Sequence, residues 1–173
     1  MVIDFPIFIA PSFYKFDFSD LPCLIGAFAM GAIPSVFIEI IKIIVKLLIK
    51  PTSTAYVGEI ASFLFSGVYC ISATLYYKNH RNKKGAFIGI VIGSLLMVVL
   101  SAFLNYYFII PSFSRLYNIP IESIIKLGHD IIPIVNTRFD FIMLCVVPFN
   151  MIKVIIIDVL TFLLYKRLST YLK

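Results

Sequence analysis

The feature that most constrains this chain is a series of long apolar stretches, which cover residues 55–77, 85–110 and 139–165. Each is long enough to cross the hydrocarbon core of a bilayer, which takes about 20 apolar residues in a helix. Lipid offers no hydrogen-bond partners to backbone N–H and C=O groups, and a helix pairs these groups within a single segment. The sequence therefore predicts an all-α membrane protein.

The composition supports this class of protein. Hydrophobic residues make up 61% of the 173 residues, and the mean hydropathy is +1.00. Soluble domains have about 45–50% apolar residues. A chain of this length has room for only a few spans, so we expect one compact bundle, a single integral-membrane domain over residues 1–173.

Two further helices are predicted near the N-terminus, at residues 20–31 and 34–50. The first is preceded by Ser19, a residue suited to capping, and has Pro22 in its first turn. At 1.5 Å per residue it covers about 18 Å, too short for a core of about 30 Å. We expect residues 1–20 to form an aromatic loop. The connection 111–138 is expected to contain a short amphipathic helix at 120–129.

Basic residues are distributed unevenly between the two sets of connections. The loop 78–84 and the tail 166–173 together hold seven Lys or Arg, whereas the longer connections on the other side hold five: Lys15, Lys50, Arg115, Lys126 and Arg138. Cytoplasmic loops carry the excess of Lys and Arg. We therefore expect the loop 78–84 and the C-terminus to be cytoplasmic in a multi-pass protein of the bacterial plasma membrane.

The last apolar stretch contains an amide and an amine near its middle. Asn150 and Lys153 are three residues apart, so they share one helix face. Pro148 lies one turn earlier and removes a backbone hydrogen bond. A polar side chain inside a span needs a partner or a cavity. One interpretation is the wall of an outward-facing polar pocket; the alternative is that Lys153 pairs with an acid such as Glu39 or Glu59, and Asn150 joins two helices.

Other polar residues near the spans are open to two interpretations. Asn105 lies at a similar depth, as either a helix-end cap or a ligand-binding group. Glu59 begins the third helix, where an acid suits the helix dipole but also stands near the predicted pocket. Asp158 lies deeper, on a different face from Lys153. A stripe at spacings of three and four is expected to be ion-paired or to face water; it consists of Glu39, Lys42, Lys46 and Lys50.

Several classes of function are excluded or disfavoured. The sequence has no HExxH, GxSxG or P-loop pattern, so we do not expect an enzyme, a metal site or a bound cofactor. Cys23, Cys70 and Cys145 stand alone in apolar stretches and have no metal-binding spacing. The net charge of +6 is spread over loops and helix ends, without a nucleic-acid-binding motif beside it.

Several stretches together resemble a known family. They are "FYKFDFSDLPCLIGAFAMG", "TSTAYVGEIASFLFSG", "LNYYFIIP", "VPFNMIK" and "YKRLS", in this order. The set is similar to the riboflavin-binding S component of energy-coupling factor (ECF) transporters, the RibU family. The resemblance implies a six-helix transmembrane bundle with a short second helix and a vitamin pocket open to the outside. About five helices are expected here, because most of the family's first helix is missing, as in a truncated chain or one with a late start. Ser62 stands where the family often has Asn.

The resemblance also implies which residues bind the vitamin. The polar edge of an isoalloxazine ring presents carbonyls beside an imide N–H, which an Asn carboxamide and a Lys ammonium match as donors and acceptors. By similarity the ligand role goes to Asn150 and Lys153, followed by Asn105. Flat rings bind between apolar and aromatic walls. Candidates around these groups are Phe13, Tyr14, Phe16, Phe18, Phe149 and Glu59.

The family mechanism implies capture of riboflavin, or its phosphate FMN, outside the cell, with transport driven by a membrane T component and two cytoplasmic ATPases. Riboflavin is then a transported ligand and not a cofactor. Two alternatives stay open at this point. One is an S component for another vitamin, such as thiamine or biotin. The other is a structural subunit of a membrane complex, in which Lys153 only pairs with an acid.

Overall fold

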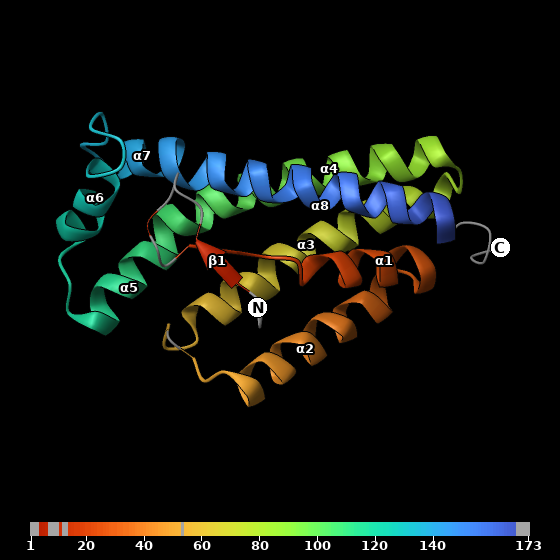
Figure 1. Ribbon diagram of the computed structural model, residues 1–173, viewed down its shortest axis with the longest axis horizontal. Coiled ribbons are helices and arrows are strands. Elements are labelled where there is room, and N and C mark those ends of the chain that lie inside the picture. The colour runs from red at the N-terminus through yellow and green to blue at the C-terminus, as the bar shows by residue number, and fades with distance from the viewer. Residues whose placement is uncertain (1–3, 7–10, 12–13, 53, 169–173) are drawn as a thin grey trace.

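The computed structural model describes the chain except residues 1–3, 7–10, 12–13, 53 and 169–173 (Figure 1). The described part confirms a helical membrane protein. Its helices are α1 (Asp20–Met30), α2 (Ala32–Ile49), α3 (Val57–Asn79), α4 (Lys83–Leu104), α5 (Ile110–Tyr117), α6 (Ile121–His129), α7 (Arg138–Phe141) and α8 (Val147–Leu168). Five of these described helices, α1 to α4 and α8, have more than ten residues.

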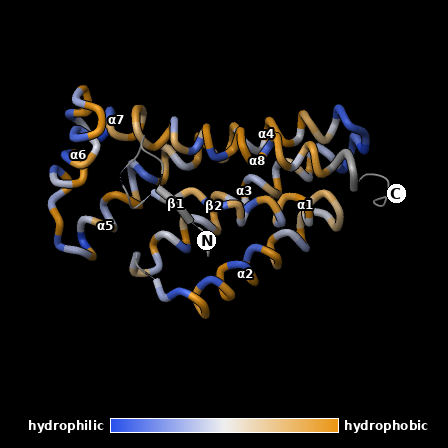
Figure 2. Tube along the Cα trace, viewed as in Figure 1, coloured by the Kyte–Doolittle hydropathy of each residue, from blue (hydrophilic) through white to orange (hydrophobic). Residues whose placement is uncertain are grey.

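Three long apolar helices have the length and composition to cross a membrane: Val57–Asn79, Lys83–Tyr117 and Arg138–Leu164. Large apolar side chains on their surfaces are exposed, among them Leu95, Val99 and Ile155. Exposed apolar surface of this kind suits contact with lipid. Figure 2 shows hydrophobic residues along these helices, and hydrophilic residues at the α3–α4 connection and around α6.

The N-terminal segment is more ordered than a plain loop. Two short strands, β1 (Asp4–Pro6) and β2 (Lys15–Asp17), pair antiparallel with Phe5 opposite Phe16. The strand β2 leads directly into α1, whose bounds agree with the predicted short helix. The predicted amphipathic helix at 120–129 is confirmed as α6.

The prediction that the second long span ends at Ile110 is wrong. A π-helical segment, η1 (Asn105–Ile109), continues α4 into α5 as far as Tyr117. A second one, η2 (Ile142–Val146), joins α7 to α8. Each segment ends two residues before a proline, Pro111 or Pro148. A proline lacks an N–H and crowds the carbonyl four residues back, and local π adjustment lets a membrane helix continue past it.

The centre of the bundle is formed by α3 and α4, which pack at close range. A Cβ added to Gly89 would lie 2.5 Å from the Ala73 carbonyl oxygen, and one added to Gly93 would lie 2.7 Å from that of Tyr69. Small residues of this kind let membrane helices approach closely. On the other side of α3, α1 and α2 pack as a short helical pair.

The two ends of the bundle differ in what they carry. The α3–α4 connection and the C-terminal end of α8 lie at one end, and α5, α6 and α7 lie at the other (Figure 1). The α3–α4 connection and the end of α8 therefore lie at the same end of the bundle.

We predict that Gly89→Ala destabilises the protein, because its methyl group would overlap the Ala73 carbonyl oxygen. Overpacking of a tight interface typically costs about 1–3 kcal/mol. The measurement is thermal unfolding in detergent. The matched control is Gly67→Ala in α3, where an added Cβ has no atom within 4 Å. Equal stability of the two variants would contradict close α3–α4 packing.

Candidate functional site

A cavity of about 560 Å³ lies in the half of the bundle that carries α5 and α6. Its wall is formed by the N-terminal segment, the α2–α3 connection, the start of α3, the η1–α5 region, α6 and α8. Ligand cavities in proteins have volumes of about 300–1,000 Å³. Most of the wall is apolar, with aromatic contributions from Phe65, Phe113 and Phe149.

Six of the predicted site residues line this cavity: Tyr14, Glu59, Asn105, Phe149, Asn150 and Lys153. Phe16 and Phe18 do not. Phe16 is 1% exposed and packs edge-on against Phe18, which is 41% exposed. Asp17 of β2 lines the cavity, and alternation along a strand sends the side chain of its neighbour Phe16 to the opposite side. Tyr14 precedes β2 and Phe18 follows it, so the strand pattern does not extend to either ring. Phe13 lies outside the described residues.

Asn105 is the first residue of η1 and is buried. Its Oδ1 accepts a hydrogen bond of 2.5 Å from the Tyr14 hydroxyl, and its Nδ2 donates to the Ser101 carbonyl oxygen at 2.8 Å. The Tyr14 ring also packs against Phe149, with the ring centroids 5.6 Å apart. Tyr14 therefore ties the N-terminal segment to both long helices beside the cavity.

Asn150 and Lys153 line the cavity from α8, as their shared helix face predicts. The Asn150 Nδ2 donates to the Val146 carbonyl oxygen at 2.9 Å. That carbonyl belongs to η2, just before Pro148, in the part of the helix where the regular backbone pattern changes. The side-chain amide thus supplies a donor to a backbone acceptor within the altered turn.

Lys153 has an acid partner that the sequence analysis did not identify. Its Nζ lies 2.7 Å from Asp20 Oδ2 in the first turn of α1. The alternative of an ion pair is therefore correct in kind, but the predicted partners, Glu39 and Glu59, are wrong. The two interpretations of Lys153 are compatible, because its ammonium pairs with Asp20 and the residue also lines the cavity.

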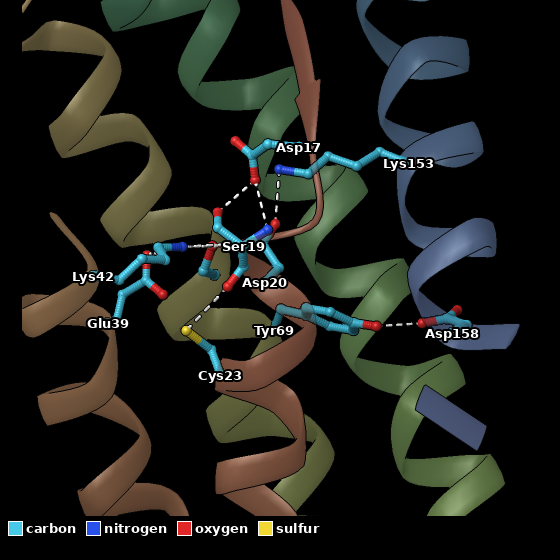
Figure 3. A network of polar contacts seen from close by, with 10 residues as sticks. Asp17, Ser19, Asp20, Cys23, Glu39, Lys42, Tyr69, Lys153 and Asp158 are labelled. Atoms are coloured by element: carbon cyan, nitrogen blue, oxygen red, sulfur yellow. Dashed lines mark hydrogen bonds and ion pairs between the residues drawn. The ribbon is translucent and has the colours of Figure 1, made fainter. Parts of the chain in front are cut away.

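Asp20 is the centre of a buried polar network that joins four helices (Figure 3). Its Oδ1 accepts from Lys42 of α2 at 2.8 Å and from Ser66 of α3 at 2.5 Å. Its Oδ2 faces Lys153 of α8. Lys42 also pairs with Glu39 at 2.6 Å. Each of the two ammonium groups therefore has a carboxylate partner inside the bundle.

Glu59 belongs to a separate cluster at the margin of the cavity. It pairs with Lys46, and its Oε2 accepts from Thr52 at 3.1 Å and from Thr54 at 2.9 Å. Three residues of the predicted stripe on α2, Glu39, Lys42 and Lys46, are therefore ion-paired toward the bundle. The opposite face of α2 is apolar and exposed, at Phe37, Ile41 and Leu48 among others.

Asp17 is a further lining residue that the sequence analysis did not select. It accepts hydrogen bonds from the backbone N–H of Ser19, at 2.9 Å, and from the Ser19 hydroxyl. Burial is the largest influence and alone would raise the pKa of this carboxyl, but the Lys153 ammonium and the Ser19 hydrogen bond act together to hold the pKa below its usual value. Asp17 therefore adds a second negative charge beside Lys153.

Asp158 lies away from the cavity, between α8, α3 and α4. It accepts from the Tyr69 hydroxyl and from Ser94, at 2.9 and 2.7 Å to its two oxygens. Among the described residues, the donors that Asp158 accepts from are thus hydroxyl groups. Its role is to join these three helices deep in the bundle.

Comparison with known proteins places this geometry in a family. A model of the "ECF transporter, substrate-specific component" family matches residues 1–165. The chain belongs to this family. Its members are transporter components and not enzymes, and the long apolar helices agree with an S component that is integral to the membrane.

Several individual proteins are similar to this S component. The Riboflavin transporter RibU of Staphylococcus aureus (strain TCH60) is 30% identical over 171 residues, covering 99% of this chain and 83% of the relative. The Riboflavin transporter FmnP of Bacillus subtilis (strain 168) is 26% identical, covering 100% of this chain and 86% of the relative.

A solved structure has the same fold. It is described as "Structure and mechanism of the S component of a bacterial ECF transporter", and it superimposes with a TM-score of 0.75 at 28% identity. The match covers 98% of this chain and 86% of that chain. The family indicated by the sequence motifs is therefore confirmed both by sequence and by structure.

Proposed function

We propose that this S component captures riboflavin in the cavity between α8, η1 and the N-terminal segment. The observation that carries the proposal is that one cavity brings together Asn105, Asn150 and Lys153 inside an apolar wall. Those residues come from segments about 45 residues apart in the sequence. The relatives RibU and FmnP are named riboflavin transporters, which supports the same ligand.

The polar groups suit the edge of an isoalloxazine ring. A Lys ammonium has three donor hydrogens, and Asp20 engages one side of Lys153. Donors remain for a carbonyl oxygen of the ligand. Asn150 adds an amide with both donor and acceptor capacity. Phe149, Phe65 and Phe113 supply flat apolar surface for the ring itself.

Asn105 takes part through an exchange of partners. Its Oδ1 already accepts from Tyr14, so a ligand that bonds this oxygen must replace or share that hydroxyl. When the ligand replaces the Tyr14 hydroxyl at Asn105, Tyr14 loses its hydrogen bond to η1. Entry of the ligand is thereby coupled to a rearrangement of the N-terminal segment, which we propose as the cover of the cavity.

Transport itself is assigned to other subunits. In this proposal a membrane T component and two cytoplasmic ATPases form the module with which this chain associates, and the chain catalyses no reaction. The cavity opens at the extracellular end, and the α3–α4 connection with the C-terminus is cytoplasmic. The support for this orientation is the excess of Lys and Arg at that end.

Binding is tested by titrating the purified protein with riboflavin and following the quenching of flavin fluorescence. Lys153→Met removes a charge-assisted donor worth about 1.5–3 kcal/mol, so we expect the affinity to fall about 10- to 100-fold. Asn150→Ala removes a neutral amide worth about 0.5–1.5 kcal/mol, and we expect a loss of about 3- to 10-fold.

The matched control for the amide is Asn136→Ala, because Asn136 is exposed and lies outside the cavity wall. The riboflavin affinity of the Asn136→Ala variant should stay within twofold of that of the parent protein. If the parent protein fails to bind riboflavin, the proposed ligand is wrong. Thiamine and biotin are then titrated in the same way, and a change in thermal stability with either of them identifies another vitamin.

Orientation is tested by placing single cysteines at exposed positions in a protein from which Cys23, Cys70 and Cys145 have been removed. We expect Arg81→Cys to resist an impermeant thiol reagent in intact cells and Ser123→Cys to react rapidly. Arg81 is preferable to Asn82, whose side chain accepts from the Gly85 N–H at 2.7 Å and caps α4. Rapid labelling at position 81 with protection at 123 would show the reverse orientation.

A further inference from the structure

We infer that Asp20 is a positioning residue for ligand binding, which acts by holding the Lys153 ammonium at the cavity wall. This inference rests on the proposed function. Lys153 lines the cavity and Asp20 does not, although the two side chains are 2.7 Å apart. Ser66 also lines the cavity and contacts Asp20, but its hydroxyl hydrogen is donated to Asp20 itself. Asp20 therefore acts on a ligand donor through the Lys153 ammonium.

The carboxylate of Asp20 is itself fixed in place. It is 1% exposed and lies in the first turn of α1. Lys42 and Ser66 both donate to its Oδ1, from α2 and from α3, which leaves Oδ2 directed toward Lys153. Donors on two other helices thus set the position of the oxygen that Lys153 meets (Figure 3).

Lysine needs such an anchor more than most residues do. Its ammonium stands at the end of a flexible four-carbon stem, and its charge is a point without preferred direction. A hydrogen bond to a fixed carboxylate restricts the Lys153 side chain before the ligand arrives. Ligand binding then costs less conformational entropy. Pre-organisation of this kind raises affinity by lowering the cost of ordering.

A second carboxylate explains why loss of Asp20 should weaken binding even if Lys153 stays charged. Asp17 also lies beside Lys153, and it lines the cavity. Without the Asp20 charge, the ammonium has Asp17 as its remaining anionic neighbour. We expect it to turn toward that group and away from its position for the ligand.

The same arrangement indicates the chemical class of the ligand group at this end of the cavity. Two carboxylates, Asp17 and Asp20, stand beside the ammonium groups of Lys153 and Lys42. The positive charge of Lys153 is thus already offset before a ligand arrives. An uncharged acceptor such as a ring carbonyl fits here, whereas a carboxylate would meet two negative charges beside a Lys153 ammonium that is already paired.

The test is a double-mutant cycle on riboflavin affinity, with Asp20→Asn, Lys153→Met and the combined variant. We expect about a 10-fold loss for Asp20→Asn and about a 10- to 100-fold loss for Lys153→Met. The combined variant should bind no more weakly than Lys153→Met alone, because Asp20 has nothing left to position. If Asp20 had a purely structural role, its substitution would still weaken riboflavin binding in a protein that already carries Lys153→Met.

Three results would overturn the inference. They are an unchanged affinity of Asp20→Asn, a tighter affinity, or losses that multiply in the combined variant. Failure of the parent protein to bind riboflavin would instead refute the proposed function, so the two failures are distinguishable. If Asp20→Asn does not fold, Asp20→Glu replaces it in the cycle, because the longer side chain keeps the charge but displaces the carboxylate. The same non-additivity is then expected.

The matched control removes charge from the network without touching Lys153. The variant Glu39→Gln removes the second carboxylate that pairs with Lys42 on α2 but leaves the Lys42–Asp20 pair in place, and Glu39 does not line the cavity. Thermal unfolding is followed in all variants. We expect this control to melt at a lower temperature but to keep riboflavin affinity within about threefold. A loss as large as that of Asp20→Asn would show that general disturbance of the network weakens binding, and would contradict a specific role for Asp20.

Discussion

The carboxylate of Asp20 is the interaction on which the arrangement of this S component depends. It meets Lys42, Ser66 and Lys153, which belong to α2, α3 and α8. A charged group inside a bilayer needs a partner or water, and breaking one side of a buried pair typically costs about 3–5 kcal/mol. Asp20 reaches both ammonium groups only from the present position of α1, and there it helps both to stay charged within the bundle. The short α1 is thereby held at the depth of the cavity.

The cavity follows from this arrangement together with two proline-associated changes in helix geometry. The segments η1 and η2 contact each other, and π-helical turns occur frequently at functional sites. One begins at Asn105, and the other contains the Val146 carbonyl that Asn150 binds. Tyr14 joins the first of these to the N-terminal segment. The polar groups are therefore directed inward at the level where the helices depart from regular α-geometry, while the lipid-facing surface stays apolar.

Much of this could be predicted from the sequence, because helix length and polar spacing are local properties. The shared face of Asn150 and Lys153, the short α1 and the helix α6 are examples. The partner of Lys153 could not be predicted, because it depends on the depth at which α1 packs against α8. Lys153 needed an acid near the outer half of the bundle, and the first turn of a short helix is one place to look for it. The sequence predicts a helix end at Pro111, because a π turn leaves no clear local signal. The aromatic composition of the first loop does not distinguish Phe16 and Phe18 from Tyr14, because β2 covers only Lys15–Asp17 and the chain turns at either end of it.

A structure of the protein with riboflavin bound tests the account most directly. The account predicts the isoalloxazine ring between Phe149 and the other aromatic walls of the cavity. It also predicts that the Lys153 ammonium contacts a ring carbonyl and Asp20 Oδ2 at the same time. Riboflavin bound outside this cavity would contradict the proposed site. Riboflavin in the cavity with Lys153 turned away from it, or with the Lys153–Asp20 pair broken, would contradict the role assigned to the network.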